Sequence, residues 1–378
     1  MHSPAVNPSH RVPRPSRGLQ PARRYAHRSI ESVFHFVPAL RRNYLILFAF
    51  HWLPGCAAPQ GELFPRLETG LVFPPPPDIP RIRWLGELRD SGDLKAARSG
   101  VEVFQAAMRG PLPPIPFSSP HGLTLREGRY LAVADGTGGV VHLIDLVDRS
   151  HRMISGFDKE RFGSPMGVVW MGHQLYVTDA ARREVIVLHD DGSLAQRFGA
   201  QELVRPVGIA FAASINRLFV VDSGAHRIGS FAPNGGDVQW LGERGSGLGQ
   251  FNFPTHIVVA GDHLWVADTG NFRVQMLNLD GHSLNMFGQK GDAAGDLSLP
   301  KGLAVDRGGH VYVVDAHFEN VQIFDPEGRL LMAFGEPGVG RGQFSLPAGL
   351  TIDEQDRIWV ADAGNHRIQV FEYLRTSS

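Results

Sequence analysis

Cysteine is nearly absent from this chain, since Cys56 is the only one among 378 residues. No intramolecular disulfide can therefore form, and zinc sites built from pairs of cysteines are excluded. Long apolar runs are also missing. The clearest one, residues 44–53, has about ten residues, whereas a helix that spans a bilayer needs about 20. A glycine-rich phosphate loop is absent as well, which removes the nucleotide-binding classes that depend on one.

Positive and negative charges nearly cancel, but they are unevenly distributed along the chain. Lys and Arg total 37 and Asp and Glu total 38, for a formal net charge of −1. Residues 1–55 hold eight Arg, no Lys and one acid, Glu31, which makes +7 and leaves −8 for residues 56–378. An acidic region with only four Lys in the whole chain matches a phosphate backbone poorly, so no nucleic-acid partner is expected.

The sequence is dominated by a repeat. Six times, a Pro-x-Gly motif or a close variant precedes a short apolar segment, a turn and a second apolar segment that ends in Asp. These aspartates recur at intervals of 43 to 47 residues: Asp135, Asp179, Asp222, Asp268, Asp315 and Asp362. A third and a fourth short segment follow in most units. This period predicts an all-β fold, a six-bladed β-propeller with four-stranded blades.

The sixth unit lacks a fourth segment, because the chain ends soon after its third. Residues 82–88 (IRWLGEL) resemble residues 238–244 (VQWLGER), the outer strand of the third unit. We therefore expect residues 81–88 to be the N-terminal outer strand that closes the last blade and removes a free edge. Apolar residues at spacings of three and four over 93–109 predict a short inserted helix.

The N-terminal segment has the features of an export signal. Arg41 and Arg42 precede the apolar run, and Gly55 stands directly before Cys56. A basic flank, a short apolar segment and a small residue before a lone Cys are typical of a bacterial lipoprotein signal, in which Cys56 would be lipidated. Pro54 is an imperfect match to that signal. A transit peptide, or an unmodified Cys56 behind a weak anchor, are the alternatives.

This interpretation divides the chain into three parts. Residues 1–56 are a disordered extension with the signal and lipoprotein segment, residues 57–80 a Pro-rich linker, and residues 81–378 the propeller. The four consecutive prolines of the linker favour an extended spacer. The expected location is the bacterial cell envelope, outside the cytoplasm, with membrane contact only through the lipid anchor.

The six repeated aspartates do not predict a metal site. One Asp per blade, at the end of the second strand, places them around a ring, too far apart to share an ion whose ligands lie about 2.3–2.6 Å away. An Asp at a strand end instead binds the backbone of the turn that follows. In three units an Arg stands five residues after the Asp and is expected to pair with it: Arg227, Arg273 and Arg367.

Positions at which the units differ are better candidates for function. The residue between Pro and Gly begins the innermost strand and should face the mouth of the channel. The six residues at this position are His121, Met166, Val207, Thr255, Lys301 and Ala348, and His256 replaces the Gly of the fourth unit. The turns after each Asp lie at the same end of the blades. The predicted binding face carries His121, Thr255, His256, Lys301, His226, Phe272, His317, Phe318 and His366, and no catalytic residue is expected.

Three segments carry a resemblance to a known family: residues 362–371 (DAGNHRIQVF), 268–275 (DTGNFRVQ) and 342–350 (GQFSLPAGL). On these motifs, residues 81–378 resemble NHL-repeat propellers, and the layout with a signal and a lone Cys is most similar to bacterial NHL-repeat lipoproteins. The resemblance favours a non-enzymatic binding or scaffold module. Its partner would be a protein, a peptide or an envelope polymer.

The alternative that the resemblance leaves open is a metal-dependent lyase or hydrolase. Peptidyl-hydroxyglycine lyases resemble these propellers and bind zinc through histidines at the Pro-x-Gly position of several blades. In this sequence only His121 occupies that position, with His256 offset by one residue, whereas a catalytic zinc generally needs about three protein ligands. No cofactor is therefore assigned. A single zinc or calcium ion in the channel, or an anion, held by His121 and His256, stays an alternative. RNA binding is a third.

Overall fold

The computed structural model describes residues 62–65, 70–94, 108 and 113–374. Contacts within the chain group residues 55–378 as one compact unit. All of the described residues belong to this unit, which contains the six repeats.

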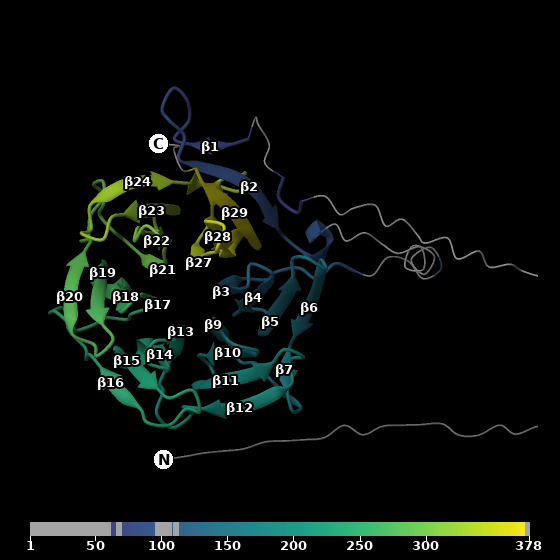
Figure 1. Ribbon diagram of the computed structural model, residues 1–378, viewed down its shortest axis with the longest axis vertical. Coiled ribbons are helices and arrows are strands. Elements are labelled where there is room, and N and C mark those ends of the chain that lie inside the picture. The colour runs from purple at the N-terminus through teal and green to yellow at the C-terminus, as the bar shows by residue number, and fades with distance from the viewer. Residues whose placement is uncertain (1–61, 66–69, 95–107, 109–112, 375–378) are drawn as a thin grey trace, which may run out of the picture. The chain divides into compact units, whose positions relative to one another are not determined.

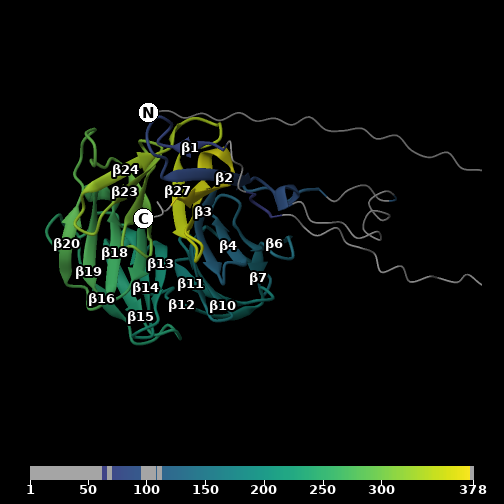
Figure 2. The same ribbon diagram turned by 45° about the horizontal axis from the view of Figure 1, so that its top comes forward.

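Six antiparallel sheets form a ring around a central channel (Figure 1), which confirms the predicted six-bladed propeller. The first three blades are β3–β6 (Pro120–Arg126, Tyr130–Asp135, Val140–Asp145, Ser150–Ile154), β9–β12 (Pro165–Met171, Gln174–Asp179, Glu184–His189, Leu194–Phe198) and β13–β16 (Pro206–Ala212, Arg217–Asp222, Arg227–Phe231, Gln239–Leu241). Blades four and five are β17–β20 (His256–Ala260, His263–Asp268, Arg273–Asn278, Ser283–Phe287) and β21–β24 (Pro300–Val305, Val311–Asp315, Asn320–Phe324, Leu330–Phe334). Figure 2 shows the strands running between the two faces of the ring.

The core of the ring is divided among the spaces between neighbouring blades. Each of its six apolar clusters joins residues of two adjacent blades. Because a blade is covered on both faces, its second strand is buried almost throughout, as in β18 (His263–Asp268), where only the first residue is partly exposed. Burial on both faces explains why these strands are nearly continuous apolar runs rather than alternating ones.

Blade six is completed from the N-terminal side, as predicted. It consists of β27 (Pro347–Ile352), β28 (Arg357–Asp362), β29 (Arg367–Tyr373) and β2 (Ile82–Leu88), and β2 pairs antiparallel with β29. Ile82 and Leu88 are buried in the clusters on the two sides of this blade. The closing strand therefore contributes to the core as well as covering the edge of β29.

The Pro-rich segment 57–80, expected to be a linker, packs on the propeller where it is described. β1 (Val72–Phe73) pairs with β2 as a fifth strand of blade six, and residues 74–81 form the turn between these strands instead of an extended spacer. The Phe73 ring lies 6.0 Å from that of Phe334, and the buried Phe64 ring lies 5.5 Å from that of Trp359. Apolar side chains interspersed among the prolines hold this segment on blade six.

Small elements connect the blades. A hairpin of β7 (Gly156–Phe157) and β8 (Glu160–Arg161) lies between blades one and two, and β25 (Glu336–Pro337) pairs with β26 (Gln343–Phe344) before blade six. Short 3-10 turns are η1 (Ser91–Leu94), η2 (Ser223–Ala225), η3 (Thr269–Asn271) and η4 (Ala363–Asn365).

The helix predicted over 93–109 falls almost wholly outside the described residues, as does Cys56 with the predicted signal. No helix in the described part is long and apolar enough to cross a membrane.

Candidate functional site

The six repeated aspartates are completely buried and are engaged with backbone amides. Asp315, the last residue of β22, accepts hydrogen bonds from two pairs of backbone N–H groups. Ser298 and Leu299 lie just before β21, and His317 and Phe318 lie in the turn after β22. Equivalent bonds join each of the other aspartates to the segment before its own first strand. The predicted structural role is confirmed. Besides the turn that follows it, each Asp also binds the backbone just before the innermost strand of its blade, and it thereby fixes where that strand begins.

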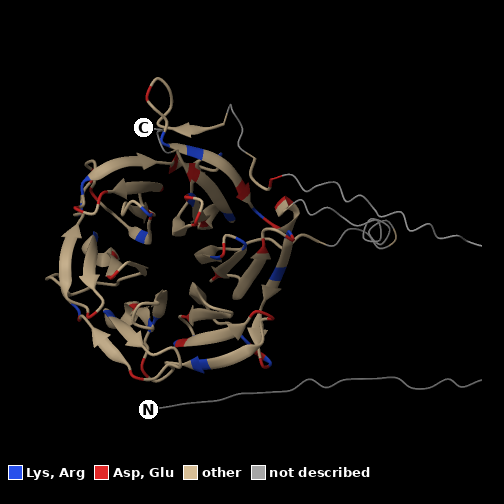
Figure 3. Ribbon diagram, in the orientation of Figure 1, with Lys and Arg blue, Asp and Glu red and all other residues tan. Residues whose placement is uncertain are grey.

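The predicted Asp–Arg pairs are present in all three blades, with different geometry. Arg273 Nε lies 2.8 Å from Asp268 and Arg367 Nε lies 2.7 Å from Asp362. In blade three the distance between Arg227 Nε and Asp222 is 3.6 Å. Figure 3 shows that charged residues are concentrated at turns and edges, while the strands around the channel are largely uncharged.

Glycines of the Pro-x-Gly motifs allow the innermost strands to meet closely around the channel. A Cβ atom on Gly349 would lie 2.2 Å from the His121 carbonyl oxygen, and one on Gly122 would lie 2.4 Å from the Met166 carbonyl oxygen. No side chain fits such a gap, so these positions require glycine. Between blades four and five, His256 replaces the glycine and places an imidazole at the channel.

The channel itself contains a cavity of about 170 Å³, lined by the first strands of all six blades. Most of its lining side chains are apolar, such as Val169, Ile257 and Leu303, and His256 is the only titratable residue among them. Half-buried His121, Thr255 and Lys301 lie at the starts of these strands.

Titratable groups gather at the mouth of this channel. Burial, and then the positive charges of Lys301, His256 and Arg205, lower the pKa of His121 to about 3. Burial also lowers the pKa of His256 to about 4 and lowers that of Lys301. At neutral pH both histidines are therefore uncharged, and each offers one N–H donor and one lone pair. The structure thus brings together four groups from blades one, three, four and five.

These residues do not fit a catalytic zinc site of the lyase type. Within the described residues no group of three or more His, Cys, Asp and Glu side chains could hold a metal ion. His121 and His256 would supply two nitrogens, Met166 and Val207 stand at two of the other equivalent positions, and the nearby Lys301 is a cation. The arrangement is suited to hydrogen bonding and charge pairing.

Two of the predicted face residues instead connect neighbouring blades. His226 Nδ1 accepts a hydrogen bond from the Phe253 backbone N–H at 3.1 Å, and its ring lies 4.2 Å from the Phe253 ring. His366 Nδ1 bonds the Ser118 carbonyl oxygen, which joins blade six to blade one. Both histidines adopt a left-handed backbone conformation.

The other three predicted face residues make ring contacts of their own. The Phe272 ring lies 5.2 Å from Lys290 Nζ. His317 is exposed next to the half-buried Phe318, with ring centroids 5.5 Å apart. Neither contact involves His121, His256 or Lys301.

A histidine pair in blade one was not among the predicted sites. His142 Nδ1 lies 2.8 Å from His151 Nε2, and His142 Nε2 lies 3.5 Å from Asp135 Oδ2. Burial, and then the charge of His142, lower the pKa of His151 to about 3. The sequence does contain a signal for this pair. His142 stands seven residues after the repeated Asp of blade one, whereas blades four to six have Gln at that position: Gln275, Gln322 and Gln369.

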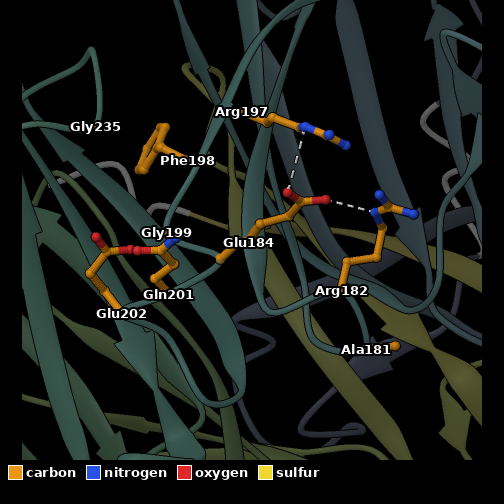
Figure 4. A pocket seen from close by; sticks show the side chains of 10 residues that line it. Ala181, Arg182, Glu184, Arg197, Phe198, Gly199, Gln201, Glu202 and Gly235 are labelled. Carbon is orange, nitrogen blue, oxygen red and sulfur yellow. Dashed lines mark hydrogen bonds and ion pairs between the residues drawn. The ribbon is translucent and has the colours of Figure 1, made fainter.

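A cavity of about 750 Å³ lies at the rim between blades two and three (Figure 4). Glu184 stands there between Arg182 and Arg197, 2.6 Å from Arg182 Nε and 4.0 Å from Arg197 Nε. Both arginines also pair with Glu160. Because these charges already neutralise one another, the cavity offers a ligand less electrostatic attraction than the channel mouth does.

Comparison with known proteins agrees with this architecture. The family model for the NHL repeat matches residues 251–276 and 344–371. None of the curated proteins matches the chain in sequence. Among solved structures, an auxiliary nutrient binding protein from Bacteroides thetaiotaomicron matches with 15% identity over 68% of this chain and 70% of that chain, at a TM-score of 0.54.

Two enzymes also match the fold. A catalytically inactive virginiamycin B lyase from Staphylococcus aureus, with quinupristin, shows 12% identity over 68% of this chain and 95% of that chain, at a TM-score of 0.52. A gluconolactonase from Xanthomonas campestris shows 16% identity over 68% of this chain and 87% of that chain, at a TM-score of 0.51. At such identities the likeness concerns the fold, and function must be argued from the site.

Proposed function

We propose that this chain, a six-bladed β-propeller built of NHL repeats, is a non-enzymatic binding module whose ligand sits over the mouth of the central channel. The observation that carries this proposal is the set of unlike residues at the mouth. His121, His256 and Lys301 occupy positions that hold apolar residues or glycine in most other blades. The repeated aspartates, by contrast, are already engaged with the fold.

The geometry supports binding more than catalysis. The mouth offers neutral donors and cations on a rigid ring, with no nucleophile activated by a base among the described residues around it. Propellers present such surfaces at the ends of their strands, where loops and strand starts meet. A protein, a peptide or an envelope polymer is the partner we propose, and the nutrient-binding neighbour is compatible with that class.

Location in the bacterial envelope is part of the same proposal. Lipidation of Cys56 would hold the propeller outside the cytoplasm, at the membrane surface. The segment around Phe64 already packs on blade six, so few residues separate the anchor from the ring. Cys56→Ser is expected to move the protein from the membrane fraction to the soluble fraction, and unchanged fractionation would rule out the lipid anchor.

Binding at the mouth can be tested by thermal shift with a panel of peptides and saccharides. A ligand present at 100 times its Kd stabilises the folded state by about 2.7 kcal/mol. His256→Gly restores the residue that the other five blades carry at this position, and it should abolish the shift of a true ligand. Met153→Ser, on an exposed outer strand, is the matched control. A ligand that binds both variants equally well does not bind at the mouth.

Elemental analysis separates this proposal from the metal-dependent lyase or hydrolase. The protein purified without chelators should contain neither zinc nor calcium in stoichiometric amount. A metal content near one ion per chain, lost in His121→Ala, would support the enzyme instead. RNA binding is tested by gel shift at low salt, where charge-driven association is strongest, and no shift is expected.

A further inference from the structure

We propose that the channel mouth recognises an oxyanion, a carboxylate or phosphate group of the ligand, through Lys301 and Arg205, with His121 and His256 as neutral donors. This inference rests on the proposed function and names the chemistry of its ligand. It concerns only the part of the ligand that reaches the mouth, its carboxylate or phosphate group.

The first support is the composition of the positions that surround the mouth. Two positions per blade lie there, the residue before the conserved Pro and the residue after it. They are Ser119, His121, Ser164, Met166, Arg205, Val207, Phe253, Thr255, Leu299, Lys301, Leu346 and Ala348. None of the twelve is acidic, although residues 56–378 carry a net charge of −8. The mouth is thus a cationic spot on an acidic domain.

The second support is that both cations lack partners. Among the described residues, the side chains of Lys301 and Arg205 make no hydrogen bond and no ion pair. Lys301 is nevertheless half-buried. A buried cation without a counter-ion is costly, and an oxyanion placed beside it would remove that cost.

The third support is convergence across the ring. Lys301, His256 and Arg205 come from blades five, four and three, and all three act on His121 of blade one. Every charge that shifts the pKa of His121 is positive, and no carboxylate contributes. The innermost strands that carry these groups approach one another closely, as the contacts at Gly122 and Gly349 show, and no carboxylate is among the groups that shift the pKa of His121.

The acidic side chains bonded to mouth positions are already engaged with backbone groups. Glu319 accepts the Leu346 backbone N–H at 3.0 Å. Asp222 accepts the backbone N–H groups of Val204 and Arg205. Asp315 accepts two backbone N–H groups before β21 and two after β22. The oxygens of these two aspartates point into their own blades. An anion from outside is left as the partner of the two cations, and the N–H groups of two uncharged imidazoles can orient it.

The apolar channel sets the shape of the rest of the ligand. Below the mouth the cavity has about 170 Å³ and is lined mainly by Val, Ile, Leu and Gly. An oxyanion attached to a slim uncharged chain would fit both parts. A polyanion would not, because its further charges would meet an apolar wall.

The test follows the imidazole NMR signals of His121 and His256 in the full-length protein, with succinate and inorganic phosphate as probes. Sodium chloride at equal ionic strength is the control for general screening. We expect saturable shifts with at least one probe and about tenfold weaker binding in Lys301→Met. Lys290→Met is the matched control, since Lys290 lies over Phe272 away from the mouth, and its affinity should be unchanged.

The probes also separate this inference from the function on which it rests. Saturation by succinate alone assigns a carboxylate, and saturation by phosphate alone assigns a phosphate. Shifts equal to those with chloride, or equal affinity in Lys301→Met, would overturn the oxyanion site. If an uncharged capped peptide or saccharide shifts the same signals while the anions do not, the mouth still binds a ligand but the oxyanion is wrong. If none of these probes shifts them, neither proposal holds.

Discussion

Blades four and one hold their repeated aspartates with different partners. In blade four, Asp268 receives Arg273 Nε at 2.8 Å, and the Asn271 and Gln275 side chains also donate to it. In blade one, Asp135 has backbone partners and one side chain, that of His142, 3.5 Å away. Burial alone would raise the pKa of Asp135, but these hydrogen bonds outweigh it and lower the pKa.

The two blades show which part of the repeat the fold requires. The bonds from the Asp to the backbone before the first strand occur in both, whereas the side-chain partners differ. Blade two differs further, because Glu184 stands where blades three, four and six have Arg, and its charge is balanced by Arg182 and Arg197. The backbone bonds define the blade, and the side-chain shell can change as long as buried charge stays paired.

The largest effect should come from blade six, the blade that two distant parts of the chain build together. Deleting residues 1–88 removes β2 with Ile82 and Leu88, and each buried apolar side chain of this size contributes about 1.5–3 kcal/mol. Domains are stable by only about 5–15 kcal/mol, so we expect no cooperative thermal unfolding. Deleting residues 1–61 should leave the transition unchanged. A cooperative transition at the wild-type temperature after the longer deletion would show that β2 does not close the ring.

A smaller effect should distinguish blades four and three. Asp268→Ala leaves the buried Arg273 without its carboxylate, which costs about 3–5 kcal/mol. Asp222→Ala mainly leaves backbone N–H groups without an acceptor, which costs about 1–3 kcal/mol. Arg227 keeps a second contact in this variant, because it lies over the Trp240 ring at 3.5 Å. Urea unfolding of both variants measures the difference. Equal losses would mean that the close Arg adds nothing to the blade.

Blade one should respond to acid through His151. The pKa of this histidine is about 3 in the folded protein and about 6.5 when unfolded. Below pH 6.5 the unfolded chain therefore binds a proton that the folded one does not. Stability then falls as the pH decreases toward 3, by at most about 1.4 kcal/mol per pH unit. His151→Gln should reduce the loss between pH 7 and pH 5 by about 2 kcal/mol at most, measured by urea unfolding.

The control for that measurement is His317→Gln, at an exposed position of blade five. It should keep the wild-type pH dependence. If His151→Gln keeps it too, the pair in blade one does not contribute to acid sensitivity, and His121 and His256 at the channel would be the next candidates, since their pKa values are lowered in the same direction.

The smallest effect is expected in blade two. Glu184→Gln removes a buried carboxylate between Arg182 and Arg197, but both arginines are partly exposed and keep Glu160 as a partner. We expect a loss of about 1 kcal/mol in urea unfolding, because solvent can stabilise the remaining charges. A loss as large as that of Asp268→Ala would show that Glu184 and its arginines stabilise blade two as much as the Asp268–Arg273 pair stabilises blade four.

Much of the fold could be predicted because its signals are local or repeated. The period of the aspartates predicted six blades, and the likeness of residues 82–88 to another outer strand predicted the closure. The roles of His226 and His366 could not be predicted in the same way. His366 bonds Ser118, which lies 248 positions away in the chain, and no pattern within one repeat indicates a contact that only ring closure creates. The packing of Phe64 on Trp359 escaped prediction for the same reason.

The candidate site divides similarly. The sequence alone identified His121, His256 and Lys301, because comparison of six units shows directly where one of them departs from the rest. It could not show that Arg205 joins them, or that His226 and His366 are committed to blade contacts. Strand number and blade number follow from residues close together in the chain. Which of these groups lie near one another at the channel is decided only when the ring closes, since the four groups come from four different blades and the distances between blades exist only in the folded protein.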